Sequence, residues 1–392
     1  MVSLLRRATL ALAGAAALAA AASSAPTAEA APVAQAESAA QAAPASAAPG
    51  WSIANVLSDE TYSNLLTLAA VGKHDAWAFG QINSTGKPVA AHWNGSAWTR
   101  SRIPGAFTRP GYVSATGPRN VWAGGSECSG GPGSQNISAA YVARYNGRAW
   151  TTTKWKTGAY CGGALVTTGA RNGWLLGYDQ ALHFTGKRWQ KVSVPSLGQV
   201  IAATAVSSHD IWTADLRLNA EHLSRSTEFF THYNGHSWRT VRIPPVKLPK
   251  HGFIYPFDID AASANSIWAT VTVEPAAVHS YLLHWTARKW HTIALPDTPD
   301  QLLQVTPDGA GGAWLIMFQT ATGAYSFVHY TDGTWTVDPV PTAGLAGLIP
   351  GSESFDVYAL ARIPGTQSML ATGDVFYATA KDSSVAKSLI FR

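Results

Sequence analysis

The stretch His209-Asp210-Ile211-Trp212, followed by His232-Tyr233-Asn234-Gly235-His236-Ser237-Trp238, decides the fold because both of its parts recur along the chain. The first part places a Trp after a short polar turn, and the second places an aromatic residue five positions before another Trp. The six copies have their first Trp at Trp77, Trp122, Trp174, Trp212, Trp268 and Trp314, and their aromatic pairs at Trp93/Trp98, Tyr145/Trp150, Phe184/Trp189, Tyr233/Trp238, Trp285/Trp290 and Tyr330/Trp335. A spacing this regular indicates one structural unit used repeatedly.

Each unit predicts four short strands, which in the first unit cover residues 65–71, 76–81, 89–93 and 98–103. Between the paired aromatics lie Asn-Gly, Thr-Gly, Thr-Ala or Asp-Gly, which suit the left-handed positions of a tight hairpin turn. Four-stranded units of roughly 45 to 50 residues are typical of a β-propeller. The sequence therefore predicts an all-β fold.

A seventh unit is degenerate, and it is divided between the two ends of the chain. Residues 368–373 occupy the place of the second strand, with Leu370 where the Trp would stand, and residues 388–391 supply the third strand. Residues 51–56 resemble 189–194 and supply the missing fourth strand. We therefore expect a seven-bladed β-propeller of four-stranded blades, closed by pairing of the N-terminal strand that begins at Trp51 with the C-terminal blade.

The N-terminal region predicts export. Residues 1–30 combine Arg6 and Arg7 with a short alanine-rich apolar run, and Ala28-Glu29-Ala30 suits a signal peptidase that cuts near Ala30. The general secretory route and the twin-arginine route both remain open. Residues 31–50 hold only Ala, Pro, Ser, Gln, Glu, Val and a final Gly, so we expect a flexible linker before the propeller at 51–392. The expected location is extracellular.

Charge and composition indicate which classes of binding partner the chain is expected to have. The formal net charge is +5, but the cations are scattered, which argues against a nucleic-acid partner. No second long apolar segment follows the signal, so we expect no membrane insertion, and we expect a monomer. Cys128 and Cys161 are an even number of cysteines in an exported chain, which predicts a disulfide; free thiols are the alternative.

The hairpin from Tyr233 to Trp238, ending at Pro244, resembles Kelch repeats and the central propeller of galactose oxidase. The resemblance covers the chain after Trp51 and implies a secreted bacterial propeller, although the Gly-Gly pair of Kelch repeats occurs only at Gly124-Gly125. Galactose oxidase would imply a copper site of two Tyr and two His, and no positions here carry it over. Residues 331–335, Thr-Asp-Gly-Thr-Trp, resemble a degenerate Asp-box of sialidase propellers, which is a structural turn.

Catalytic motifs are missing from the sequence. It has no Gly-x-Ser-x-Gly elbow, no His-Glu-x-x-His and no phosphate-binding glycine loop with Lys. We expect no cofactor and no metal. Five histidines invite a metal interpretation, but each directly precedes the third-strand aromatic of its unit, which favours a packing or hydrogen-bonding role in every blade: His92, His183, His232, His284 and His329.

The innermost strands provide one candidate ligand site. Among the six clear units, only Asp258 and Asp260 place charges on the face that we expect to line the central channel. They either hold a cation or polar ligand or are two solvated carboxylates in a wet pore.

Connection length points to a second candidate site. In a propeller, the turns joining strands one to two and three to four lie on one face, and here they are short. The connections on the other face vary greatly, so we place a binding surface there. Its candidate ligand-binding residues are Tyr112, Glu127, Tyr160, Tyr178, Arg217, Glu221, Arg225 and Tyr255. We expect a non-catalytic binding or scaffold propeller that recognises a glycan or an extracellular protein; a secreted glycan-active hydrolase or oxidase is the alternative.

Overall fold

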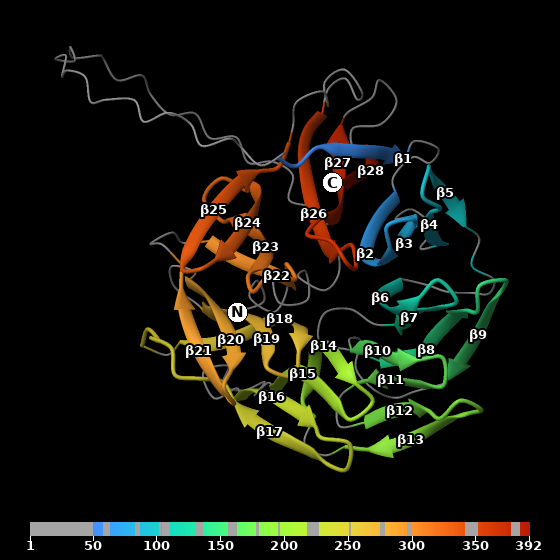
Figure 1. Cartoon of the computed structure of the whole chain (residues 1–392), viewed down its shortest axis with the longest axis horizontal. Coiled ribbons are helices and arrows are strands. Elements are labelled where there is room, and N and C mark those ends of the chain that lie inside the picture. The colour runs from blue at the N-terminus through green and yellow to red at the C-terminus, as the bar shows by residue number, and fades with distance from the viewer. Residues whose placement is uncertain are drawn as a thin grey trace.

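The computed structural model is a ring of seven four-stranded antiparallel sheets arranged around a common centre, as Figure 1 shows. It describes residues 50–57, 63–82, 87–101, 103, 110–129, 136–155, 163–177, 180–194, 197–217, 227–250, 252–274, 279–295, 300–341, 352–377 and 385–392. The all-β seven-bladed propeller predicted from the repeat is confirmed. Within this described part of the chain, no helix is long and apolar enough to cross a membrane.

Each blade runs from the channel outward in the order of its strands. The innermost strands are β2 (Ser63–Gly72), β6 (Pro110–Gly117), β10 (Ala164–Gly169), β14 (Gln199–Ser207), β18 (Phe253–Ser263), β22 (Asp300–Pro307) and β26 (Ser352–Arg362). The second strands are β3 (Asp75–Ile82), β7 (Asn120–Ser129), β11 (Asn172–Leu176), β15 (Asp210–Arg217), β19 (Ser266–Glu274), β23 (Ala313–Gln319) and β27 (Met369–Tyr377).

The third and fourth strands complete each blade. The third strands are β4 (Lys87–Trp93), β8 (Asn136–Tyr145), β12 (Gln180–Phe184), β16 (Thr227–Tyr233), β20 (His279–Thr286), β24 (Tyr325–Thr331) and β28 (Val385–Phe391). The outermost strands are β5 (Trp98–Ser101), β9 (Trp150–Trp155), β13 (Trp189–Ser193), β17 (Trp238–Arg242), β21 (Lys289–Ala294), β25 (Thr334–Pro339) and β1 (Ile53–Leu57). We number the blades by their innermost strand, so β2 begins blade 1 and β26 begins blade 7.

Blade 7 is closed by the N-terminal strand, as the sequence predicted. β1 pairs with β28 antiparallel, with Val56 opposite Leu389, and the backbone of Ser52 exchanges two hydrogen bonds with Arg392 at 2.8 and 2.9 Å. Leu370 stands opposite Ala361 of the innermost strand, as Trp212 stands opposite Thr204 in blade 4. The substitution of Leu for Trp is therefore confirmed by register.

Tryptophans hold neighbouring blades together. The second-strand Trp of one blade meets the outer-strand Trp of the next edge to face, with ring centroids 5.2 Å apart for Trp77/Trp150 and 5.6 Å apart for Trp174/Trp238. Trp51 completes the series, because its ring lies 5.5 Å from Trp314 in the same geometry. Since aromatic pairs contribute about 0.5–1.5 kcal/mol each beyond area burial, this repeated contact is a principal source of stability between blades.

The turns differ between the two faces of the ring. Only two residues separate Ser207 from Asp210 on the face that we call the short-turn face, whereas nine separate Arg217 from Thr227 on the opposite, long-loop face. Strands reach further into the long-loop connections than the sequence suggested. Tyr255, which the sequence placed on the face of variable connections, lies inside β18.

Candidate functional site

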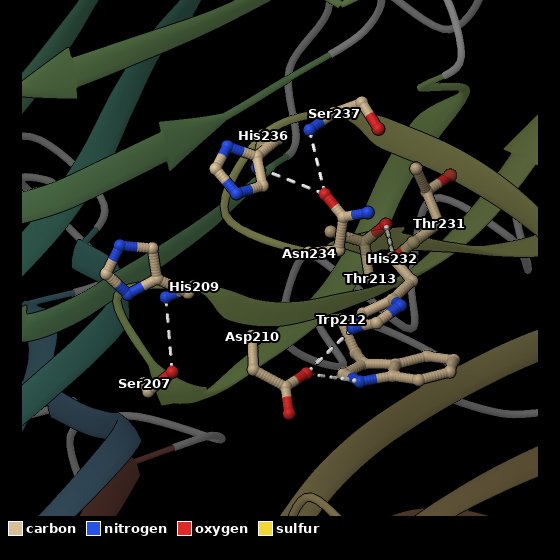
Figure 2. A network of polar contacts seen from close by, with 10 residues as sticks. All are labelled: Ser207, His209, Asp210, Trp212, Thr213, Thr231, His232, Asn234, His236 and Ser237. Carbon is tan, nitrogen blue, oxygen red and sulfur yellow. Dashed lines mark hydrogen bonds and ion pairs between the residues drawn. The ribbon is translucent and has the colours of Figure 1, made fainter. Parts of the chain in front are cut away.

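The repeated histidines are part of the blade structure rather than of a ligand site. In blade 4 one Asp210 carboxylate oxygen accepts hydrogen bonds from the Trp212 indole N–H at 2.9 Å and from His232 at 2.8 Å (Figure 2). The His232 ring also stacks on Trp212, with centroids 4.2 Å apart. A carboxylate that holds both rings fixes the second strand to the third, which confirms the structural role predicted from the repeat.

The other four histidines repeat this arrangement with different acceptors. Each stacks on the Trp of its own blade. The ring nitrogen reaches the first residue of the second strand in three blades, and in blade 6 it reaches the residue that directly follows the innermost strand: His92 with Asp75, His183 with Asn172, His284 with Ser266 and His329 with Asp308. Burial lowers the pKa of His183 and of His284, so both are neutral at pH 7. In blade 2 the guanidinium of Arg144 lies over the Trp122 ring instead, at 5.2 Å.

Asp258 and Asp260 lie on β18 and connect three blades. Asp258 Oδ2 accepts the backbone N–H of Val305 on β22 of blade 6 at 3.0 Å. Asp260 Oδ1 accepts the Thr204 hydroxyl of β14 in blade 4 at 3.0 Å and the N–H of Ala261 at 2.8 Å. The two carboxyl groups are partly buried and engaged with protein donors. They are therefore not the freely solvated carboxylates that one sequence interpretation described.

The surroundings of these two groups favour their neutral forms. Burial raises the pKa of Asp258 to about 7, and the charge of Asp260 adds to this effect although the Val305 N–H opposes it. Burial also raises the pKa of Asp260 to about 6, against the hydrogen bonds from Ala261 and Thr204 and the nearby positive charge of Arg362. Near neutral pH the pair therefore changes its charge readily, as a ligand-responsive or catalytic carboxyl would.

Similar ties between innermost strands occur where no acid is present. The Ser114 hydroxyl accepts the Thr167 N–H from the next blade at 2.9 Å, and Gln304 accepts the Leu360 N–H at 2.5 Å. Polar side chains at this level of the channel therefore act first as connectors between blades. The ligand role of Asp258 and Asp260 stays a prediction.

Three of the residues predicted on the long-loop face can be placed. Tyr112 lies on β6 and packs with Leu165 of blade 3, and burial raises its pKa. Tyr255 is only 6% exposed and packs on Phe257 with ring centroids 5.0 Å apart, so it belongs to the core between blades 4 and 5. Arg217 is exposed at the end of β15, with its guanidinium 5.1 Å from the Phe229 ring. Of these three, Arg217 is the one displayed to solvent.

The side chains of the remaining predicted residues lie outside the described part of the structure. The backbone of Glu127 and Cys128 belongs to β7, but their side chains are not described. Outside the described residues lie Tyr160, Cys161, Tyr178, Glu221 and Arg225. The disulfide between Cys128 and Cys161 therefore stays a prediction.

Sequence reasoning missed a second set of acidic groups. Asp215 in β15 is fully buried and accepts a hydrogen bond from Thr213, and burial raises its pKa to about 7. Burial likewise raises the pKa of Glu228, at the start of β16, to about 7. Asp356 and Asp374 face each other across blade 7. An acid inside an otherwise apolar strand, as in Met369–Tyr377, was the available sequence signal.

No metal centre is formed within the described ranges, where no group of three or more His, Cys, Asp or Glu could hold an ion. The described acids discussed above occur singly or in pairs, with Asp258 and Asp260 on one strand and Asp356 and Asp374 on two neighbouring strands.

Comparison with known proteins supports the fold. Neither a family model nor a curated protein sequence matches the chain, so no Kelch or galactose-oxidase family match supports that resemblance. The GH74 xyloglucanase from Xanthomonas campestris is 13% identical, with a TM-score of 0.56 over 83% of this chain and 53% of that one. The β-propeller domain of the Trilobed protease from Pyrococcus furiosus is 10% identical, with a TM-score of 0.51 over 84% and 93%.

A third similar structure is an extracellular domain assigned to a one component system of B. thetaiotaomicron. It is 10% identical, with a TM-score of 0.51 over 86% of this chain and 40% of that one. The chain thus spans about half the length of the xyloglucanase and less than half of the B. thetaiotaomicron domain. At these identities the likeness is one of architecture, shared by glycan-active enzymes and sensor domains alike.

Proposed function

We propose that this chain is an exported, non-catalytic binding propeller that recognises a glycan or an extracellular protein through its long-loop face. The observation that carries the proposal is the contrast between the two faces of the ring. On the short-turn face, the hairpin turns of blades 1 to 4 repeat one geometry; in three of them an Asn side chain accepts two backbone N–H groups, as Asn94, Asn146 and Asn234 do. Connections on the opposite face vary more, from three residues between Leu176 and Gln180 to twelve between Pro339 and Ser352. Binding residues on a rigid frame are typically found on such variable connections.

Side chains on β15 and β18 supply suitable chemistry. Arg217 offers five N–H donors from an exposed position at the end of β15. Phe253 begins β18 at the long-loop face, and Phe257 lies four residues further along the same strand; both rings are half-buried. Aromatic rings that stack on an apolar sugar face or side chain, combined with a few polar groups, are typical of a recognition surface.

One observation favours a glycan-active enzyme as a second candidate. A general acid must hold a proton near neutral pH, and the pKa of Asp258, raised by burial to about 7, meets this requirement. The second carboxyl of such a pair would be Asp260, on the same face of the same strand. Both carboxyls already bind protein donors, so we rank this function below binding.

The test is a glycan array and a cell-wall pull-down with protein that begins at Ala31. Arg217→Ala and Phe257→Ala should each weaken saturable binding by about tenfold, the effect of losing roughly 1.4 kcal/mol of contact energy. Arg148→Ala, an exposed change on the short-turn face, is the matched control and should bind like the unchanged protein. Equal binding by all three variants would refute the long-loop face, and release of reducing sugar that Asp258→Asn abolishes would favour the enzyme.

A further inference from the structure

Two carboxyl side chains face each other inside the blade that closes the ring. Asp356 of β26 and Asp374 of β27 are direct partners in the antiparallel register. Side chains at such positions have Cβ atoms about 4.5–5.5 Å apart, and like charges placed there repel each other. Blade 7 is also the blade that β1 completes, so this repulsion would act on the closure itself.

The groups around the pair are neutral donors from three blades. The Tyr358 hydroxyl donates to Asp356 Oδ2 at 3.2 Å, and the Tyr325 hydroxyl reaches Asp356 from β24 of blade 6. The Ser388 hydroxyl of β28 and the backbone N–H of Leu65 on β2 of blade 1 face Asp374. Both neighbouring blades therefore place polar groups near the pair, but within the described structure neither carboxyl oxygen of the buried Asp374 has a hydrogen-bond partner at normal distance.

Within the described ranges, no positive charge balances the two carboxylates. The charge that acts on Asp374 is the negative charge of Asp356. No Lys, Arg or His charge acts on either acid among the described residues. Lys387, the lysine of β28, lies 5.6 Å from the Tyr377 ring instead. In the part of the chain that the structure describes, the groups that can stabilise a charge on the pair are therefore neutral hydroxyl and amide donors.

Burial makes double ionisation costly. Asp374 is 0% exposed and Ser388 is 1% exposed, so water cannot stabilise a charge at this point. An unpaired buried carboxylate costs several kcal/mol, which a proton shared between two acids avoids. In agreement, burial and the charge of Asp356 raise the pKa of Asp374 well above its ordinary value, and burial raises the pKa of Asp356 and of Tyr358.

We propose that Asp356 and Asp374 share a single proton, and that loss of this proton to solvent as pH rises loosens the blade that closes the ring. Closure is tightest at acidic pH, where the pair is protonated. It weakens as pH rises above the ordinary carboxyl range and most steeply where the second carboxyl ionises, because a folded state that prefers the protonated form loses stability in that direction.

The experiment follows amide hydrogen exchange of β1 and β28 between pH 5 and pH 9, after correction for the intrinsic pH dependence of exchange. We expect protection of both strands to fall at least tenfold with rising pH in the unchanged protein. Asp374→Asn, which keeps the shape and removes one charge, should abolish most of this loss, and Asp356→Asn should do the same. Asp332→Asn changes an exposed turn residue and should leave the loss intact.

Two results would overturn the proposal. One is an unchanged pH dependence in both variants of the pair. The other is a Ca²⁺-dependent rise in melting temperature that the unchanged protein shows and Asp374→Asn lacks, because a cation rather than a proton would then balance the pair. If Asp374→Asn fails to fold, Asp356→Asn alone decides between these outcomes, since Asp356 is the more exposed partner.

Discussion

Replacing Trp51 by Ala should weaken ring closure more than any other single change in β1 or the residues before it. The indole ring stacks on Phe327 with centroids 3.9 Å apart and meets Trp314 edge to face at 5.5 Å. Half-burying a Trp removes roughly 100 Å² from water, worth about 2.5 kcal/mol at 25 cal/mol per Å². The two ring contacts add about 1–3 kcal/mol. We therefore expect Trp51→Ala to lower the free energy of unfolding by about 3.5–5.5 kcal/mol.

Urea unfolding measured by far-UV circular dichroism gives this value, and amide exchange of β28 shows where the loosening occurs. Trp51→Phe keeps a ring on Phe327 and should lose less than half as much. Trp238→Ala removes the equivalent outer Trp of blade 4, whose ring lies 5.6 Å from Trp174, and should cost a similar amount without affecting β28. A loss below about 1 kcal/mol for Trp51→Ala, or unaltered exchange in β28, would contradict the closing role of this residue.

Three further predictions concern the interior. Gly80→Ala should lower the free energy of unfolding by at least about 3 kcal/mol, because an added Cβ would lie 1.6 Å from the backbone oxygen of Asn64. As a control in the same urea assay, Gly72→Ala should change it by less than about 1 kcal/mol, because a Cβ there meets nothing within 4 Å. Asp308→Asn should cost about 1–2 kcal/mol at pH 7. Hydrogen bonds outweigh burial and hold the pKa of Asp308 below its ordinary value, so this difference should shrink as pH falls below about 4, measured by thermal melting. Asp258→Asn should make the protein more stable than the unchanged chain at pH 9 and equal to it at pH 4, because burial raises the pKa of Asp258 to about 7; a constant difference across this pH range would refute the assignment.

The sequence predicted the fold because the features that specify a propeller are local and repeated. Each Trp, each aromatic pair and each turn can be recognised within one unit, and blade 7 could be completed by analogy with Trp189 and the residues after it. The structural role of the five repeated histidines was predictable for the same reason, because each stands at one position of its unit. Even the residue that replaces the missing Trp, Leu370, was assigned correctly from its place in the pattern.

The candidate site was less predictable because its electrostatics depend on contacts between blades. Strand alternation could place Asp258 and Asp260 on the face expected to line the channel. It could not identify their hydrogen-bond donors, Val305 and Thr204, which lie on other units about 50 residues away. Asp356 and Asp374 were missed because the seventh unit departs from the repeat, and residues there had no counterpart with which to be compared. Tyr255 was expected on a surface loop, but β18 extends past it and buries its ring.

The pairing of β1 with β28 has a consequence for the order in which the molecule is assembled. Ser52 and Arg392 are 340 positions apart, so the first strand to be synthesised cannot find its partner until the last one has been made. The other blades are built from neighbouring strands and can form as the chain emerges, while closing so long a loop carries the largest entropic cost. Six blades would then stand as an open arc with an uncovered apolar blade face at each end. The interval before the seventh blade forms is when this protein is most exposed to proteases and to association with other chains.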